Sequence, residues 1–277
     1  MSRSYLFIPG DVPRMLQTLD VFEADAIIID FEDAVSLHQK DEARVLTHTF
    51  LSYYNFIKPE IYIRINSHLD YDLFKKDLET IKGLNIKGIV LPKTSIEALY
   101  QIEHLYDELS INFPIIGLIE TPHAFFELES ISRHSLIEGF LLGAEDLTRA
   151  LSINRTLQGD EILFARSQVV LAAKSFNKFA IDTPFTDVHD SKGLAIDTQK
   201  SAQLGFDGKA SIHPNHVSVI NEILSPSQAL IDESKRIVHQ SKTLNSMRFS
   251  LDGKMIDKPV IERANNILEK AKRYNKL

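Results

Sequence analysis

The sequence predicts an α/β fold, and within that class a (β/α)8 TIM barrel followed by a C-terminal lid segment and an extra helix. Three observations carry this prediction. Eight short apolar runs alternate with stretches of helical periodicity, which is typical of a parallel sheet whose strands are joined by helices. The chain has 277 residues, and about 250 residues is typical of such barrels. Polar residues follow nearly every run, where barrel enzymes place their active sites.

Each predicted strand is a short, continuous apolar run rather than an alternating one. Continuous runs are typical of strands that are buried on both faces, as in a parallel sheet. The last run contains a lysine. The expected strands are Ser4–Ile8, Ala26–Asp30, Ile61–Ile65, Gly88–Leu91, Ile115–Ile119, Gly139–Leu142, Phe179–Ile181 and Gly208–Ile212.

Helical periodicity fills the stretches between and after these runs. Pro13, Ser95 and Asp190 stand at helix starts, where a proline or a capping side chain is favoured. Residues 242–258 are weakly structured by pattern. The expected helices are, to within a few residues, Pro13–Phe22, His38–Ser52, Asp70–Lys82, Ser95–Leu109, His123–Ser132, Asp160–Asn177, Asp190–Leu204, Asn215–Ile223, Ser227–Ser241 and Pro259–Arg273.

The division expected from this pattern is a catalytic barrel over residues 1–240 and a lid with a helix over residues 241–277. The rival architecture is an open, doubly wound sheet with a crevice for a dinucleotide. It is weakened because no G-x-G-x-x-G fingerprint follows the first strand.

Composition excludes several classes of function. Hydrophobic content is 44% and charged content 25%, which is ordinary for a globular protein. The net charge of −7 argues against a nucleic-acid partner. The chain has no cysteine, so disulfides, thiolate metal sites and cysteine nucleophiles are excluded. No apolar stretch approaches the roughly 18 residues of a membrane span, and the first apolar run is too short for a signal peptide, so we expect a cytoplasmic protein.

The central stretch, residues 114–147, reads as a β-α-β unit that places two acids together. Glu120 follows one strand directly, and Asp146 follows the next. Consecutive parallel strands are usually neighbours, so both carboxylates should project into one space. Two such groups repel unless a cation or a proton lies between them, and Mg²⁺ prefers oxygen ligands. The alternative is that either acid caps or stabilises a helix start.

Polar residues follow seven of the eight strands, and helix capping would account for only two or three of them. Arg64 among them is suited to clamp a substrate carboxylate, because its planar fork matches that group; the alternative is an ion pair with an acid of the barrel. A metal beside an arginine stabilises negative charge on an alkoxide or enolate oxygen. The residues by themselves therefore predict a Mg²⁺-assisted lyase acting on a carboxylate-bearing substrate. The strand-end residues are Asp30, Glu32, Arg64, Lys93, Glu120, Asp146, Asp182 and His213.

Nine segments, in order from Arg3 to the last helix, resemble the serial motifs of the citrate lyase β-subunit (CitE-like) family of the HpcH/HpaI aldolase superfamily. They are RSYLFIPGDVPRM, DAIIIDFEDAV, IYIRIN, GIVLPK, GLIETP, LLGAEDL, ARSQVVLAA, GFDGKASIHP and DGKMIDKP. The resemblance implies a TIM barrel, a homotrimer, and Mg²⁺-dependent cleavage or formation of a C–C bond in a hydroxyacyl thioester. The implied products are an acetyl thioester and a 2-oxo acid.

The resemblance also implies roles for single residues. Glu120 and Asp146 would hold Mg²⁺, and Arg64 would bind the substrate carboxylate. Asp257, in a lid that packs on a neighbouring subunit, would act as an acid or base in trans. The acids expected near the metal's water ligands are Asp30, Glu32 and Asp33, and the residues expected near the substrate or the coenzyme A (CoA) thioester are Arg14, Lys93, Lys209 and His213.

The resemblance leaves the substrate open. The lid-like DGKMID segment favours a free-standing enzyme acting on citramalyl-CoA, malyl-CoA or citryl-CoA. One alternative is a citrate lyase β-subunit that works only in a complex with an α-chain and an acyl carrier protein. Another is a malate-synthase-like or thioesterase-like activity that releases free CoA.

Overall fold

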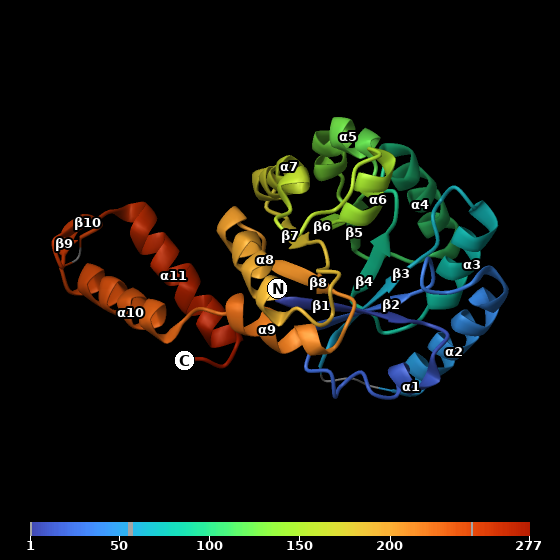
Figure 1. Cartoon of the computed structure of the whole chain (residues 1–277), viewed down its shortest axis with the longest axis horizontal. Helices are drawn as coiled ribbons and strands as arrows, with labels where there is room; N and C mark the ends of the chain where they lie inside the picture. The colour runs from blue at the N-terminus through green and yellow to red at the C-terminus, as the bar shows by residue number, and fades with distance from the viewer. Residues whose placement is uncertain (1, 55–57, 245) are drawn as a thin grey trace. The chain divides into compact units, whose positions relative to one another are not determined.

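The computed structural model describes residues 2–54, 58–244 and 246–277. Its centre is a closed barrel of eight parallel strands in sequential order, closed where β8 pairs with β1 (Figure 1). The predicted barrel is therefore confirmed. The strands are β1(Ser4–Pro9), β2(Ala26–Asp30), β3(Glu60–Arg64), β4(Gly88–Leu91), β5(Ile115–Ile119), β6(Ile137–Leu142), β7(Phe179–Asp182) and β8(Gly208–Ser211).

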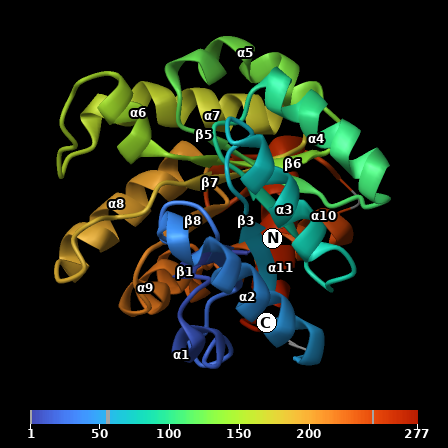
Figure 2. The ribbon, with the colours of Figure 1, turned by 90° about the vertical axis from the view of Figure 1, so that its right-hand side faces the viewer.

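Helices surround the ring of strands, as Figure 2 shows. The first helix ends at Leu16 rather than Phe22, and the hydroxyl of Thr18 donates to the Arg14 carbonyl, a local bond that competes with helical pairing. The helices are α1(Pro13–Leu16), α2(Lys40–Tyr53) after the 3-10 turn η1(Leu37–Gln39), α3(Tyr71–Ile81), α4(Ile96–Leu109), α5(Pro122–Arg133), α6(Ala144–Ala150), α7(Leu163–Ser175) after η2(Asp160–Ile162), α8(Ser191–Leu204) and α9(Asn215–Ile223).

Helix α6 was not expected from the sequence, although it carries Asp146. Its N-cap residue is Gly143, which has no side chain, so the usual capping signal is absent. The signal that could have revealed it is the pair of acids in its first turn, Glu145 and Asp146, which complement the positive end of a helix.

Two apolar clusters divide the barrel strands by side-chain direction. The cluster inside the barrel takes residues from all eight strands, among them Ile28, Tyr62 and Leu118. The larger cluster lies between strands and helices and includes Ile27 and Ile29. Because successive side chains of a strand point to opposite faces, this alternation also determines whether the residue at the end of each strand faces the barrel interior or the helices.

Residues 222–277 form a separate compact unit, so the division lies between Asn221 and Glu222 and α10 belongs to the C-terminal unit. Helix α10 packs on α11 around Ile237, Ile261 and Ala264. The stretch expected to be weakly structured holds a hairpin of β9 and β10. Its turn residues, Asp252 and Gly253, have positive φ angles, as is typical of the Asp-Gly turns that join hairpin strands. The elements are α10(Gln228–Thr243), β9(Phe249–Leu251), β10(Lys254–Ile256) and α11(Lys258–Arg273).

In the described part of the chain, no helix combines the length and apolar character that crossing a membrane requires.

Candidate active site

A cavity of about 430 Å³ lies at the carboxyl ends of the barrel strands. It brings together residues from the ends of seven strands, all except β4, and these residues span more than 200 positions of the sequence. Apolar residues, including Phe7, Leu118 and Leu141, form much of its wall. The predicted site residues that line it are Asp30, Asp33, Arg64, Glu120 and Asp146.

Arg64 forms a bidentate ion pair with Asp30. The two residues lie opposite each other in the register of β2 and β3. The Arg64 Nε atom is 2.7 Å from Asp30 Oδ1, and Nη2 is 2.5 Å from Oδ2. The guanidinium also lies over the Phe7 ring, 5.1 Å from its centroid. The ion pair with a barrel acid, one of the two interpretations of Arg64, is therefore present in the structure.

The loop after β2 adds two further carboxylates to the same arginine. Arg64 Nη1 is 3.1 Å from Glu32 Oε2 and 3.6 Å from Asp33 Oδ2. Burial alone would lower the pKa of Arg64, but the charges of Asp30, Glu32 and Asp33 raise it above its ordinary value. Burial and the negative charge of Asp33 raise the pKa of Glu32, although the cations Arg64 and Lys93 oppose this rise. The cluster formed by Asp30, Glu32, Asp33, Arg64 and Lys93 therefore carries more negative charge on its carboxylates than positive charge on its cations.

Lys40 holds this loop and was missed by the sequence analysis. Its buried ammonium donates to the main-chain carbonyls of Phe31, at 2.7 Å, and Glu32, at 2.9 Å. Burial lowers the pKa of Lys40. A signal was available, because a cation in the first turn of a helix opposes the helix dipole and needs another reason to be there.

Glu120 stands at the end of β5, and only 3% of its surface is exposed. Its Oε1 atom accepts the main-chain N–H of Lys93 at 2.7 Å, while the Lys93 ammonium lies 3.0 Å from Glu32 Oε1. Burial and the negative charges of Glu32 and Asp146 raise the pKa of Glu120 to about 8. A carboxylate in this position is stabilised by a proton or by a bound cation.

Asp146 enters the cavity from the first turn of α6. Its Oδ1 atom is 3.0 Å from Arg149 Nη2 of the same helix. The helix can begin this close to β5 because residue 143 is glycine. A Cβ atom there would lie 2.5 Å from the Glu120 Cβ and 2.9 Å from its Oε2.

The donor set suits a hard cation. Among the described residues no group of three His, Cys, Asp or Glu side chains is arranged to enclose a metal ion. Glu120 and Asp146 offer two carboxylates at one open cavity. Mg²⁺ is commonly held by one or two carboxylates and keeps several water ligands, so these residues fit that ion.

Six predicted residues do not line the cavity. Glu32 and Lys93 contact residues that do line it. Of the other four, Arg14 is exposed on α1. His213 follows β8, half-buried, and its Nδ1 atom accepts the main-chain N–H of Asn215. Asp257 is exposed in the C-terminal unit, where its carboxylate accepts the N–H of Val260 and caps α11. The fourth is Lys209.

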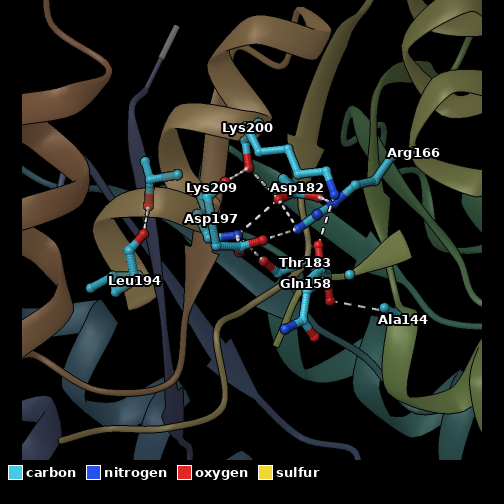
Figure 3. A network of polar contacts seen from close by, with 12 residues as sticks. Ala144, Gln158, Arg166, Asp182, Thr183, Leu194, Asp197, Lys200 and Lys209 are labelled. Carbon is cyan, nitrogen blue, oxygen red and sulfur yellow. Dashed lines mark hydrogen bonds and ion pairs between the residues drawn. The ribbon is translucent and has the colours of Figure 1, made fainter. Parts of the chain in front are cut away.

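Lys209 is fully buried, and this placement argues against the expected contact with a thioester. Its ammonium lies between Asp182 and Asp197 in the network drawn in Figure 3. The distances are 2.8 Å to Asp182 Oδ2 and 2.7 Å to Asp197 Oδ2. Arg166, also fully buried, binds the same two carboxylates. Although burial opposes it, the charges of Lys209 and Arg166 lower the pKa of Asp182 to about 2. These four residues form what we call the enclosed cluster.

The strand register explains the difference between the two groups of acids. Asp30, Arg64 and Glu120 continue the series that faces the barrel interior, two residues after Ile28, Tyr62 and Leu118. Asp182 and Lys209 instead adjoin the inward-facing Ile181 and Ala210, so they point outward to α7 and α8.

Comparison with known proteins agrees with this architecture. The family model described as HpcH/HpaI aldolase/citrate lyase matches residues 3–214. The citrate lyase subunit beta of Leuconostoc mesenteroides subsp. cremoris is 32% identical over 283 residues, covering 98% of this chain and 93% of that protein. The mitochondrial citramalyl-CoA lyase of Homo sapiens is 26% identical, covering 95% of this chain and 84% of that protein.

A solved structure extends the agreement to nearly the whole chain. The CitE protein of Mycobacterium tuberculosis, in complex with magnesium, acetoacetate and coenzyme A, superposes with a TM-score of 0.81. It is 29% identical, and the match covers 98% of both chains. From its sequence, its barrel and these matches, the chain belongs to the HpcH/HpaI aldolase/citrate lyase family.

Proposed function

We propose that this carbon–carbon lyase cleaves a 3-hydroxyacyl thioester of CoA, with Mg²⁺, into an acetyl thioester and a 2-oxo acid. The observation that carries the proposal is the position of Glu120 and Asp146 at one cavity that also contains Arg64. Relatives named citrate lyase subunit beta and citramalyl-CoA lyase support the reaction class. A solved neighbour that contains magnesium and coenzyme A supports both cofactors.

Glu120 and Asp146 would hold the metal ion, and waters or substrate oxygens would complete its shell. When bound, Mg²⁺ supplies Lewis-acid stabilisation of negative charge on oxygen. Glu120 must lose its proton before it can act as a ligand, and its pKa near 8 makes this step dependent on pH. The main-chain N–H of Lys93 fixes the orientation of the Glu120 carboxylate.

Arg64 would bind the carboxylate of the substrate through its Nη1 edge. The Nε and Nη2 atoms are already held by short bonds to Asp30, which orients the guanidinium. The contacts of Nη1 to Glu32 and Asp33 are longer, at 3.1 and 3.6 Å. Asp33 is largely exposed, so an incoming carboxylate can displace it at small cost.

Cleavage requires a base to remove the substrate hydroxyl proton and an acid to protonate the departing enolate carbon. We assign the acid step to Asp257, acting from a neighbouring copy of the chain in a homotrimer. Exposure of the carboxylate at the start of α11 leaves it accessible for this role. The C–C bond breaks, the hydroxyl carbon becomes the oxo group, and the proton moves to the acetyl thioester, so the atoms balance without water.

The experiment that tests this function measures acetyl-CoA release from citramalyl-CoA, malyl-CoA and citryl-CoA, each with Mg²⁺ and with EDTA. Mg²⁺-dependent release of acetyl-CoA and a 2-oxo acid from one of them is the expected result. Release of free CoA from acetyl-CoA and glyoxylate would instead identify a synthase or thioesterase activity.

The match to citrate lyase subunit beta, 32% identical over 98% of this chain, favours a second candidate. This candidate is a subunit that acts on a citryl group carried by a protein. No release from any CoA thioester by a folded protein, together with co-purification of an α-chain and a carrier protein, would support this candidate over the first.

A further inference from the structure

Helix α6, which carries Asp146, cannot cap its own start. The first N–H groups of a helix lack partners within the helix, and a side chain at the N-cap position usually accepts one of them. Here the N-cap residue is Gly143, and a Cβ atom at that position would collide with Glu120. The close packing of the two carboxylate-bearing segments therefore excludes an ordinary cap.

A neighbouring strand end supplies the missing acceptor. The main-chain N–H of Ala144, the first residue of α6, donates to the hydroxyl of Thr183 at 3.4 Å (Figure 3). Thr183 follows β7 directly, lines the cavity, and is 1% exposed. We propose that Thr183 is a positioning residue that caps α6 from outside the helix and thereby holds Asp146 at the metal site. The proposal rests on the function proposed above for Asp146.

Thr183 is itself held by the enclosed cluster. Its carbonyl oxygen accepts the ammonium of Lys209 at 2.7 Å. Lys209 is fixed in turn by Asp182 and Asp197, and neither cation of the cluster has any exposed surface. Since removing one partner would leave a buried charge unpaired, the cluster resists rearrangement. The main chain of Thr183 is therefore a rigid support, and its hydroxyl extends this support to α6.

Four side chains at position 183 separate capping from packing. Valine keeps the shape of threonine and removes the hydroxyl, serine keeps the hydroxyl and removes the methyl group, and alanine removes both. If the hydroxyl caps α6, threonine and serine behave alike, and valine and alanine behave alike. If the side chain only fills space, threonine instead groups with valine.

The test uses full-length protein and two measurements. The first is the dissociation constant for Mg²⁺, or for Mn²⁺ as its probe, by titration calorimetry. The second is hydrogen exchange of peptides covering residues 143–150 without metal, read by mass spectrometry. We expect Thr183→Val and Thr183→Ala to weaken metal binding and to speed exchange, each by about three- to tenfold, and Thr183→Ser to stay within about twofold.

Two outcomes would overturn the proposal. The first is a Thr183→Val protein that has the metal affinity and the hydrogen-exchange rate of the wild type. The second is an equal hydrogen-exchange rate in the Thr183→Ser and Thr183→Ala proteins. The second outcome tests the cap even if the valine variant does not fold. A wild-type chain that binds neither cation would refute the proposed function of Asp146, while exchange would still decide whether Thr183 caps α6.

Discussion

Two charged clusters lie at the carboxyl ends of the barrel strands, and they differ in the numbers of cations and carboxylates that they contain. The enclosed cluster has two cations and two carboxylates, and its two cations have no exposed surface. The open cluster around the cavity has five carboxylates and three cations. Its members are Asp30, Glu32, Asp33, Glu120 and Asp146, with Arg64, Lys93 and Arg149.

The ionisation of one acid from each cluster shows the consequence. Asp182 and Glu120 are both buried at strand ends, with 0% and 3% exposure. Yet the pKa of Asp182 is lowered to about 2 by two cations, whereas the pKa of Glu120 is raised to about 8 by burial and neighbouring carboxylates. Burial alone therefore does not decide the charge of a carboxyl group; its partners do. The enclosed cluster matches each cation with a carboxylate, whereas Glu120 in the open cluster is stabilised by a proton or by a bound cation.

The largest expected effect comes from removing the charge excess of the open cluster. Glu120→Gln and Asp146→Asn should each reduce Mg²⁺-dependent turnover by at least about 1000-fold, because a ligand is lost while the fold is kept. Steady-state kinetics and circular dichroism check this, with Glu129→Gln, an exposed change on α5, as the control. Wild-type turnover in either variant would remove that residue from the metal site.

Breaking the enclosed cluster should instead affect stability. Asp182→Asn leaves Arg166 and Lys209 with one carboxylate between them, and we expect the free energy of unfolding to fall by about 3–5 kcal/mol. Urea denaturation measures this loss. Asp187→Asn, an exposed change nearby, should stay within about 0.5 kcal/mol. Equal midpoints for the two variants would contradict the structural role of the enclosed cluster.

Substitution of Asp257 tests whether catalysis needs an acid from outside the open cluster. If Asp257 protonates the enolate, Asp257→Asn should lower kcat by about 100- to 1000-fold and leave thioester affinity nearly unchanged. Because asparagine can also cap a helix, α11 should remain intact. Measurement of kcat together with thioester binding separates the two roles. An unaltered kcat would leave Asp257 as a helix cap only.

The pKa of Glu120 predicts the pH dependence of metal binding. Below pH 8 the group is mostly protonated, so apparent Mg²⁺ affinity should rise up to about tenfold per pH unit towards pH 8 and level off above it. Calorimetric titration at several pH values checks this. An affinity that does not change between pH 6 and 8 would show that Glu120 is already ionised.

The same shift has a smaller effect on the metal-free fold. Because the folded pKa of Glu120 lies above its ordinary 4.5, the folded state binds the proton more tightly than the unfolded state does. Stability should therefore fall as the pH rises from 4.5 to 8. In urea denaturation with EDTA, Glu120→Gln should reduce the dependence of the unfolding free energy on pH. An unchanged pH dependence would show that other titratable groups cause it.

The sequence by itself determined the barrel and, to within one residue, the carboxyl ends of its strands. Continuous apolar runs such as Ala26–Asp30 and Ile115–Ile119 are buried on both faces, and helices separate them, so their number and order could be read directly. The acids after them were also placed correctly at the carboxyl ends. The motifs around Glu120 and Asp146 added the family and its chemistry.

Only the tertiary structure decided which of these polar residues face the cavity. A run that is apolar on both faces has no polar and apolar alternation to show which side faces the barrel interior. Glu120 and Asp182 therefore look alike in sequence, and Lys209 was predicted to be a site residue. Closure of the barrel turned Glu120 inward and Asp182 outward. The supports from Lys40 and Thr183 join segments that meet only through folding, because a hydrogen bond depends on distance in space and leaves no local pattern in the chain.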